Sequence, residues 1–385
     1  MTAATAMQRR PHGRRITCPE GYRAYVPAPL PPPLAWDGDL IAALSDADRT
    51  VGALAGEGRR LPNPSLVIRP FVRREAVLSS RIEGTQATLG EVMIAEAAAP
   101  YHAGADDVHE VGNYVTALEY GLRRLEALPL SLRLVRELHE RLMRGVRGDI
   151  AAPGEFRRTQ NWIGRPGCTL NDASFVPPPP AELMSCLGAW EGYLHDDALP
   201  PLVHAALIHA QFEAIHPFLD GNGRVGRLLI TLLLVERDVL PAPLLYLSAY
   251  FEATRDEYYA RLMGVTEQGE WEEWLTYFLR GVALQSQDAL NRIRRIDDLL
   301  AEWKRGLGPG RSRLPHRALD LFAENPYWTV GGLARRLGVA FTTAQRSIDR
   351  LEAVGVVARV GEARRNRLYC AESLLRALEE GLGGH

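Results

Sequence analysis

Cysteine and long apolar runs are scarce in this chain, and each shortage excludes a class of protein. The four cysteines, Cys18, Cys168, Cys186 and Cys370, are widely spaced and form no C-x-x-C pair, which excludes a zinc-finger or dithiol redox motif. No run of eighteen apolar residues is available to cross a membrane, and the first residues lack the apolar segment of a signal peptide. We therefore expect no membrane association and a cytoplasmic location.

An excess of charge of one sign is also absent. A formal net charge of -2 over 385 residues gives no overall attraction to nucleic acid or to anionic membranes. Lys304 is the only lysine, so arginine carries nearly all the positive charge, and this bias weakens any argument that rests on an arginine cluster alone. The chain is longer than one compact core usually grows, so two or three domains are expected.

Apolar periodicity predicts a mainly α-helical chain. We expect five parts: an irregular, Arg- and Pro-rich arm (1–35), a helical region (36–125), a helical core (126–285), a helix with a linker (286–310) and a C-terminal domain (311–385). In the helical region, the stretch "RPFVRREAVLSSRIEG" predicts a helix with Pro70 in its first turn and Gly84 just after its last turn, so Glu83 should lie at the C-terminal end of this helix.

Two shorter patterns indicate where β-structure interrupts the helices. Within the core, β-prone pieces at 161–163 and 173–176 predict a small hairpin, followed by four prolines at 177–180. Near the C-terminus the pattern predicts helices at about 314–324, 330–337 and 342–353, a turn at Gly338, and strands at 356–360 and 367–370. This order is typical of a winged helix-turn-helix.

The stretch "HPFLDGNGRVGR", residues 216–227, holds a histidine, an acid, three glycines and two arginines between two apolar helices. Its "GNGRVG" satisfies the dinucleotide fingerprint G-x-G-x-x-G, but that fingerprint needs a strand before the first glycine, and here the preceding residues are helical. A P-loop is excluded because no G-x-x-x-x-G-K-[ST] is present. The stretch therefore predicts a helix N-terminus reached through glycines, which is an anion site.

The side chains of this stretch suit phosphate chemistry. Arg224 and Arg227 lie three residues apart in the first helical turn and can hold successive phosphates from one face. Asp220 is an oxygen ligand for Mg²⁺, and His216 can accept a proton near neutral pH. Taken singly, each residue also fits a plain inter-helix turn with a histidine cap, but their conjunction favours a site that binds a nucleoside triphosphate and deprotonates a hydroxyl.

"HPFLDGNGRVGR" resembles the signature H-P-F-x-[DE]-G-N-G-R-x-x-R of the Fic family, the Fic/Doc protein adenylyltransferases, at every fixed position. The resemblance extends through "GEFRRTQNWIG", "FVPPPP" and "LSAYFEATRDEYYARL" and covers most of residues 60–285. It implies a Fic-type helical core with a small β-hairpin flap and, as in many bacterial members, a C-terminal winged helix. It also implies transfer of AMP from ATP to a Ser, Thr or Tyr hydroxyl of a target protein or of the chain itself.

The resemblance assigns roles along the signature. His216 would deprotonate the hydroxyl, Phe218 would anchor the loop in the core, and Asp220 would position Mg²⁺. The α- and β-phosphates would be held by the backbone and amide donors of Gly221, Asn222 and Gly223, while Arg224 would neutralise the β-phosphate and Arg227 the γ-phosphate.

Outside the signature, four residues are assigned by the same resemblance. Ser174 and Phe175 belong to the flap, which pairs with the target's main chain. Tyr258 and Tyr259 resemble a pair near the adenine, although aromatic residues at helical spacing more often belong to a core.

"SSRIEG" matches the family's inhibitory motif [ST]-x-x-x-E-[GN] through Ser79, Glu83 and Gly84. By the resemblance, Glu83 pairs with Arg227, so that ATP binds with its α-phosphate misaligned for attack. Glu83 could instead form a surface pair with Arg81 or Arg73, worth under about 1 kcal/mol. In some family members the same glutamate aligns a water that removes AMP, and the sequence leaves that activity open.

A different class of function is a DNA-binding regulator with a degenerate core. Twelve arginines face eight acidic residues from Arg311 onward, and "RVGEARRNRLY" resembles a basic wing, although winged helices also dock proteins. The intact signature argues against degeneracy. Two other Fic chemistries, phosphoryl and phosphocholine transfer, also compete; Gly223 disfavours the first, because Doc-like members have lysine there. The target protein, the signal that relieves inhibition and a homodimer are left open.

Overall fold

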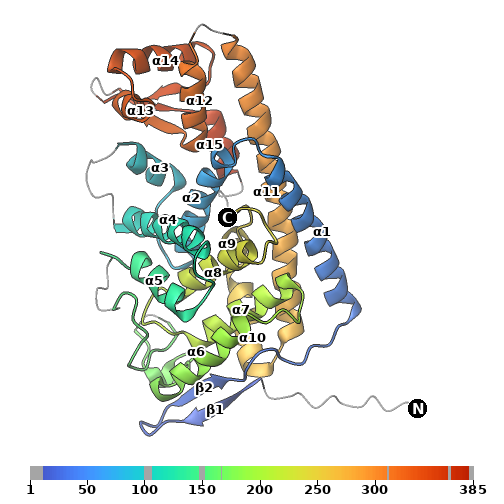
Figure 1. Cartoon of the computed structure of the whole chain (residues 1–385). Coiled ribbons are helices and arrows are strands. Elements are labelled where there is room, and N and C mark those ends of the chain that lie inside the picture. The colour runs from blue at the N-terminus through green and yellow to red at the C-terminus, as the bar shows by residue number, and fades with distance from the viewer. Residues whose placement is uncertain are drawn as a thin grey trace. The chain divides into compact units, whose positions relative to one another are not determined.

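The computed structural model describes residues 12–98, 106–146, 152–165, 167–309, 312–362 and 366–380. Within these residues the chain is mainly helical, as the sequence predicts (Figure 1). It divides into two compact units, each assembled from three separate segments: 1–51, 117–239 and 253–283 in the first unit, and 52–116, 240–252 and 284–385 in the second. This division differs from the five consecutive parts that the sequence predicts, because four helices contribute residues to both units: α1 (Gly38–Arg60), α4 (Asp106–Leu125), α11 (Trp271–Leu307) and, by its last residue, α9 (Ser248–Ala253).

The first unit holds the predicted signature. Its remaining elements are β1 (Gly13–Thr17), β2 (Arg23–Pro27), α5 (Leu132–Leu142), the 3₁₀-helix η2 (Leu170–Asp172), α6 (Pro180–Leu194), α7 (Pro201–Ile215), α8 (Asn222–Glu236) and α10 (Arg255–Gln268). Pro180 and Pro201 each occupy the first helical position, where a missing N–H costs no hydrogen bond.

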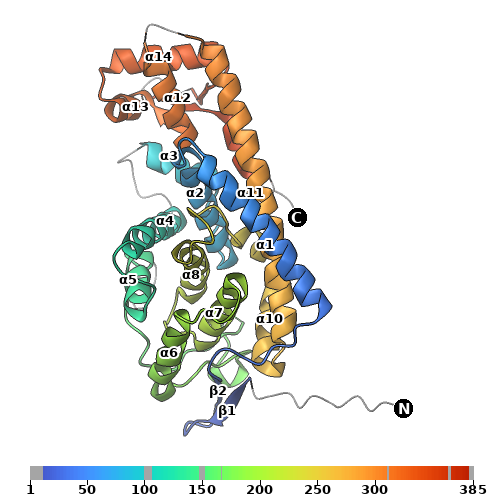
Figure 2. The same cartoon turned by 45° about the vertical axis from the view of Figure 1, so that its right-hand side comes forward.

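Helix α7 is the centre of this unit. It is buried on almost every side, as expected for a helix that is apolar all round. Two fully buried tryptophans donate their indole N–H groups to it, Trp190 to the carbonyl of Ile208 at 3.1 Å and Trp274 to that of Ala206 at 2.9 Å. Helix α8 lies between α5 and α7 (Figure 2), so the loop that joins α7 to α8 is supported from both sides.

The N-terminal arm corrects one expectation. The sequence predicts irregular structure over 1–35, whereas β1 and β2 form an antiparallel hairpin (Figure 1). Gly21, at φ +89°, makes the turn, and Tyr25 of β2 is buried against Phe175. The arginine- and proline-rich composition concealed this hairpin, because β2 is stabilised by packing against α6 and α7 and not by its own alternation.

The second unit contains the predicted inhibitory helix and the C-terminal elements. Its elements are α2 (Ser65–Ile82), α3 (Leu89–Ala98), α9 (Ser248–Ala253), α12 (Leu314–Glu324), β3 (Tyr327–Thr329), α13 (Val330–Leu337), α14 (Phe341–Ala353), β4 (Ala358–Val360), β5 (Leu368–Cys370) and α15 (Glu372–Glu379), with Ala253 itself belonging to the first unit. No described helix in either unit is both long and apolar enough to cross a membrane.

We call residues 312–380 the C-terminal module. All three helices and both strands predicted there form, and Gly338 ends α13 in the left-handed conformation at φ +69°. A further strand, β3, completes a three-stranded antiparallel sheet in the order β3-β5-β4. The expected basic wing lies partly outside the described residues, because 363–365 are not described.

Helix α2 begins earlier than predicted. It starts at Ser65, so Pro70 lies inside the helix and not in its first turn. Proline there removes one backbone hydrogen bond, and the burial of most of the following residues compensates for the loss. The predicted C-terminal end is confirmed: Glu83 is the C-cap residue, and Gly84 follows at φ +102°.

Candidate phosphate-binding loop and general base

The signature forms the loop between α7 and α8. His216 caps the end of α7 at φ +48°, and Gly221 caps the start of α8 at φ +78°. A left-handed conformation is ordinary for glycine but uncommon for histidine, and such residues cluster at functional sites. The loop therefore turns sharply at both ends, with the imidazole at one end and the first-turn amides of α8 at the other.

Hydrogen bonds to the backbone of Phe218 lock this loop. The side chain of Asn222 accepts from the Phe218 amide at 2.8 Å and donates to the Phe218 carbonyl at 2.9 Å. Asn161 donates to the same carbonyl at 2.7 Å. The Phe218 ring is fully buried, as the sequence predicts for a core anchor. The side-chain amide of Asn222 is thus committed to the loop itself.

A buried histidine from α5 supports the loop from behind. The ring of His139 stacks on Phe218 with centroids 3.7 Å apart and 4° between the planes. Its Nδ1 accepts from the Gly154 amide at 2.9 Å, so the hydrogen is on Nε2, which donates to the Asp220 carbonyl at 3.0 Å. Burial lowers the pKa of His139 to about 4, so the ring is neutral near pH 7.

Arg157 holds the other side of the loop. Its guanidinium donates to the carbonyl oxygens of His216 at 2.9 Å, Thr159 at 3.3 Å, Ile215 at 3.4 Å and also Pro178. The side chain is 4% exposed, and burial lowers its pKa to about 10, which still leaves it charged at neutral pH. One arginine thereby fixes the backbone that carries the imidazole.

The electrostatics at the start of α8 favour an anion. The first-turn amides of a helix have no intrahelical acceptor and carry a partial positive charge. Arg224 and Arg227 add two guanidiniums that are 4% and 2% exposed. A phosphate bound there would add hydrogen bonds and opposite charge to these two guanidiniums. A Cβ on Gly221 would come within 2.9 Å of Met143 Sδ, so only glycine fits this start of the helix.

Asp220 lies on the open side of the loop. Its side chain is 58% exposed and 3.8 Å from the Arg224 guanidinium, and one carboxylate oxygen accepts from the Gly221 amide at 2.6 Å. No group of three or more histidine, cysteine or acidic side chains that could hold a metal occurs among the described residues. A single exposed carboxylate fits the coordination of Mg²⁺, which takes few protein ligands and completes its shell with phosphate and water.

The predicted flap is simpler than a two-stranded hairpin. Ile163 and Phe175 form one antiparallel bridge, with backbone hydrogen bonds of 2.8 and 3.0 Å. Ser174 is exposed, while the Phe175 ring is buried and packs on Tyr25 with centroids 5.8 Å apart. The intervening η2 and loop prevent longer pairing, and the flap is anchored by Phe175.

The two tyrosines of α10 have different environments. Tyr258 is 1% exposed, and its hydroxyl is 2.9 Å from His209 Nε2. Its ring also packs against Trp274. Tyr259 is 39% exposed. This burial supports the core interpretation for Tyr258, which the helical spacing left open, and leaves Tyr259 as the accessible ring.

The inhibitory motif lies in the second unit. Ser79 is fully buried, and Glu83 is exposed at the end of α2. Of its alternative local partners, Arg73 is bound to Glu96 at 3.1 Å and Arg81 to Glu252 at 3.8 Å. Glu83 and Arg227 belong to different units, so their pairing stays a prediction.

Three residues that support the loop were not singled out by the sequence analysis. Arg157 and Asn161 fall inside "GEFRRTQNWIG", which carried part of the family resemblance, so a signal for them was present. His139 lies on the buried face of a helix, where histidine is most simply interpreted as core. Only its stacking on Phe218 reveals its contribution.

A glycine-lined loop at a helix N-terminus, with a histidine before it and two buried arginines after it, is an arrangement suited to binding a phosphate group. Family comparison is more specific: residues 41–123 match the Fic/DOC family N-terminal model, and residues 129–234 match the Fic/DOC family model. These matches assign the two segments to the Fic/DOC family models.

Relatives and solved structures agree with this assignment. Over 140 residues the chain is 34% identical to "Protein adenylyltransferase Fic" from Drosophila grimshawi, and equally to that from Drosophila virilis. Each alignment covers 35% of this chain and only 27% of the relative.

Two solved structures share the fold. A Fic family protein from Desulfovibrio desulfuricans G20 has a TM-score of 0.59 at 20% identity, covering 89% of this chain and 98% of that one. A fragment of Fic-1 from C. elegans has a TM-score of 0.51 at 22% identity, covering 66% of this chain and 74% of that one.

The first prediction concerns the hydrogen bonds from Arg157 to the loop carbonyls. Arg157→Lys should lower the free energy of unfolding by about 2 to 4 kcal/mol, because one ammonium cannot reach all the buried carbonyls that the guanidinium satisfies. Urea denaturation measures this change. Arg158→Lys, at the exposed neighbouring position, is the matched control and should unfold like wild type. Equal decreases in the free energy of unfolding in the two variants would contradict this role of Arg157.

The second prediction concerns the neutral His139. Its pKa is lower in the folded chain than in the unfolded one, so the stability it contributes is present above about pH 6.5 and lost as the pH falls towards 4. Urea denaturation at a series of pH values should show His139→Gln losing less stability over this window than wild type, by up to about 3 kcal/mol. The exposed His195→Gln should keep the wild-type profile, and a wild-type profile for His139→Gln would refute the assignment.

Proposed function

We propose that this protein is a protein adenylyltransferase that transfers AMP from ATP to a Ser, Thr or Tyr hydroxyl of a target protein or of itself. The observation that carries the proposal is the locked loop from His216 to Gly221, which places an imidazole and a helix N-terminus at the two ends of one short turn. The curated relatives named protein adenylyltransferase Fic support it over the aligned 140 residues.

His216 is the general base in this proposal. Its Nδ1 lies 3.4 Å from the Glu213 carbonyl, and donation of the Nδ1 hydrogen to that oxygen leaves Nε2 as the proton acceptor. The target hydroxyl gives its proton to Nε2 while its oxygen forms a bond to the α-phosphorus of ATP. The bond from the α-phosphorus to the bridging oxygen breaks, and pyrophosphate leaves.

The start of α8 binds the phosphates. In this proposal the backbone amides of Asn222 and Gly223 bind the α- and β-phosphates, and the Gly221 amide joins them by leaving the Asp220 carboxylate, to which it donates at 2.6 Å in this structure. Asn222 contributes through its backbone because its side chain holds Phe218. Arg224 and Arg227 neutralise the β- and γ-phosphates. Both are buried and fixed, so they lose little conformational entropy on binding.

Asp220 would hold Mg²⁺, which supplies further charge neutralisation at the phosphates when bound. Its exposed carboxylate leaves room for such an ion. On the flap, the exposure of Ser174 supports main-chain pairing with the target, while the buried Phe175 anchors the flap. Of the two tyrosines, Tyr259 is the one whose exposed ring can contact adenine.

The proposal includes inhibition by the motif of Ser79, Glu83 and Gly84. Glu83 would bind Arg227 in the resting state and so remove the guanidinium that positions the γ-phosphate. Its place at the end of α2 supports this role, because a C-cap residue is held by the helix while its side chain extends beyond it. ATP and Glu83 then compete for one arginine.

The third prediction tests this function. With α-labelled ATP and Mg²⁺, Glu83→Gly should raise self-labelling at least about tenfold, because Arg227 becomes available to the γ-phosphate. His216→Ala, alone or combined with Glu83→Gly, should abolish it. Glu126→Gly is the matched control, since Glu126 is likewise an exposed glutamate directly after a helix. Equal labelling by wild type and Glu83→Gly would refute the proposed inhibition by Glu83. Labelling by His216→Ala would refute the assignment of His216 as the general base.

A second function, DNA binding, is supported by the C-terminal module. The first turns of α14 follow the Gly338 turn as a recognition helix follows its partner. They present Phe341, which is 56% exposed, together with the exposed Thr342 and Arg346. An apolar ring, a hydroxyl and a guanidinium on one exposed turn are groups that contact thymine methyls, bases and phosphates.

The fourth prediction tests DNA binding with the full-length chain. Gel-shift titrations on double-stranded DNA fragments at several salt concentrations should show binding that weakens with salt. Arg346→Ala should weaken it and lower the salt slope by about one if the guanidinium contacts a phosphate. Arg376→Ala, an exposed arginine of α15, is the control. No shift at low salt, or equal binding by Arg346→Ala and wild type, would contradict the proposal.

A further inference from the structure

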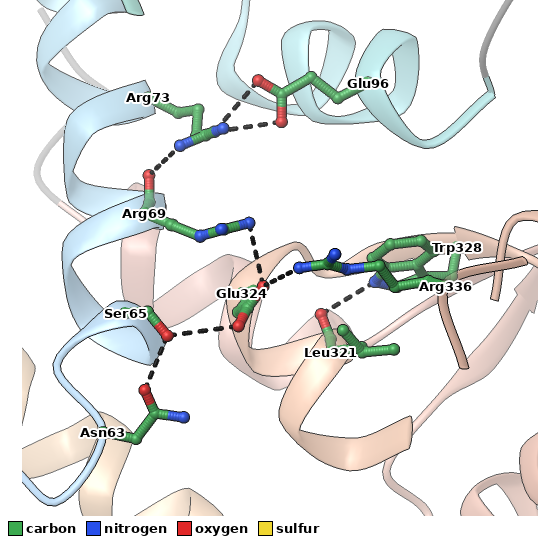
Figure 3. Close-up of polar contacts among 9 residues, drawn as sticks. All are labelled: Asn63, Ser65, Arg69, Arg73, Glu96, Leu321, Glu324, Trp328 and Arg336. Carbon is green, nitrogen blue, oxygen red and sulfur yellow. Dashed lines mark hydrogen bonds and ion pairs between the residues drawn. The ribbon is translucent and has the colours of Figure 1, made fainter. Parts of the chain in front are cut away.

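Helix α2, which ends at the proposed inhibitory glutamate, is held at its beginning by the C-terminal module. Two side chains of its first turns contact the same carboxylate at the end of α12: Ser65 Oγ donates to Glu324 Oε1 at 3.3 Å, and Arg69 Nη1 lies 3.1 Å from Glu324 Oε2 (Figure 3). All of these residues belong to one compact unit. The start of α2 is therefore attached to the module by a charged contact.

Glu324 is enclosed by donors from two directions. Its side chain is only 14% exposed, and Arg336 Nη2 of α13 lies 3.9 Å from the same oxygen that meets Arg69 (Figure 3). A carboxylate so removed from water depends on its donors, since losing them leaves a charge poorly solvated. The Arg336 guanidinium is 52% exposed, so one arm of this contact reaches the surface of the module.

Contacts next to Glu324 join the same elements. Arg73 of α2 donates to the Arg69 carbonyl and to both carboxylate oxygens of Glu96 on α3, each at 3.1 Å (Figure 3). Asn325, which follows Glu324, donates to the Met93 carbonyl of α3 at 3.0 Å. The C-terminal module thus contacts α2 directly and also contacts α3, which is bound to α2.

The middle of α2 is held within the same unit. Glu75 is 2% exposed and accepts from the hydroxyls of Tyr114 and Ser248. Arg74 lies 3.9 Å from Asp288, which Arg292 also binds, and Arg292 donates at 2.7 Å to the Ala377 carbonyl of α15. Helix α2, which is about 27 Å long at 1.5 Å per residue, is therefore held at successive turns within its unit.

We propose that Glu324 is a latch by which the C-terminal module holds α2 in its inhibitory position, so that the signal relieving inhibition enters through this module. Opening the latch frees the start of α2, and Glu83 at the other end then restrains Arg227 less. This inference rests on the proposed function, because it assigns the regulation of the same site.

The fifth prediction tests the latch with full-length protein. Glu324→Gln keeps the shape of the side chain but removes its charge, and Arg69→Gln removes the facing guanidinium. Each should raise self-labelling from α-labelled ATP by about tenfold, the effect expected from loss of one charged hydrogen bond. In the Glu83→Gly background neither change should raise labelling further, because both act through Glu83. Glu372→Gln, which alters a 3.5 Å surface pair with Arg376 in the same module, is the control and should label like wild type.

The opposite results overturn the proposal. Glu324→Gln that labels no more than wild type while Glu83→Gly is activated contradicts the latch, and so does a further rise in the Glu83→Gly background. Hydrogen exchange of α2 provides a readout that needs no activity: amides of residues 66–82 should exchange at least about threefold faster in Glu324→Gln than in Glu372→Gln. If Glu83→Gly labels no more than His216→Ala, the proposed function is wrong. Hydrogen exchange then tests the latch alone, and equal exchange rates of α2 in Glu324→Gln and Glu372→Gln would refute it.

Discussion

The backbone around Phe218 is the constraint on which the rest of the site depends. Its amide and carbonyl are bound by the side chain of Asn222, Asn161 binds the same carbonyl, and the preceding His216 carbonyl is bound by Arg157. These donors and acceptors come from α8 and from the segment after α5. The turn can therefore hold a histidine in a left-handed conformation, which a less constrained loop would relax.

Positive charge is concentrated at the start of α8. Arg224 and Arg227 are buried at the start of α8, where the helix dipole already favours negative charge. His139, whose ring supports the loop by stacking on Phe218, stays neutral because burial and the neighbouring Arg224 both lower its pKa. This concentration of positive charge suits the phosphates of the nucleotide in the proposed function. A protein adenylyltransferase uses such a site to stabilise departing pyrophosphate.

Helix α2 links the two proposals about this chain. Its C-terminal end carries Glu83, and its first turns contact Glu324 in the C-terminal module. In the two proposals, the start of this helix receives a signal from the C-terminal module and its end carries the inhibitory glutamate. A partner bound to the module would then influence the phosphate site without reaching it.

The sequence by itself determined the helical class, the position of the glycine-rich loop between two apolar helices, and the C-terminal elements. These are local: the glycines, His216 and the arginines lie within twelve residues, and the three helices after residue 312 follow their own apolar spacing. The family resemblance added roles that local pattern could not supply.

Tertiary structure decided what depends on contacts between distant segments. Strand β2 forms because α6 and α7 cover it, Pro70 is accommodated because α2 is buried along most of its length, and Tyr258 is core because His209 and Trp274 meet it. The hydrogen bonds from Arg157 and His139 to the loop likewise join residues about sixty to eighty positions apart in the sequence. No periodicity records such pairings, since their energy comes from burial and from buried polar groups that must find partners.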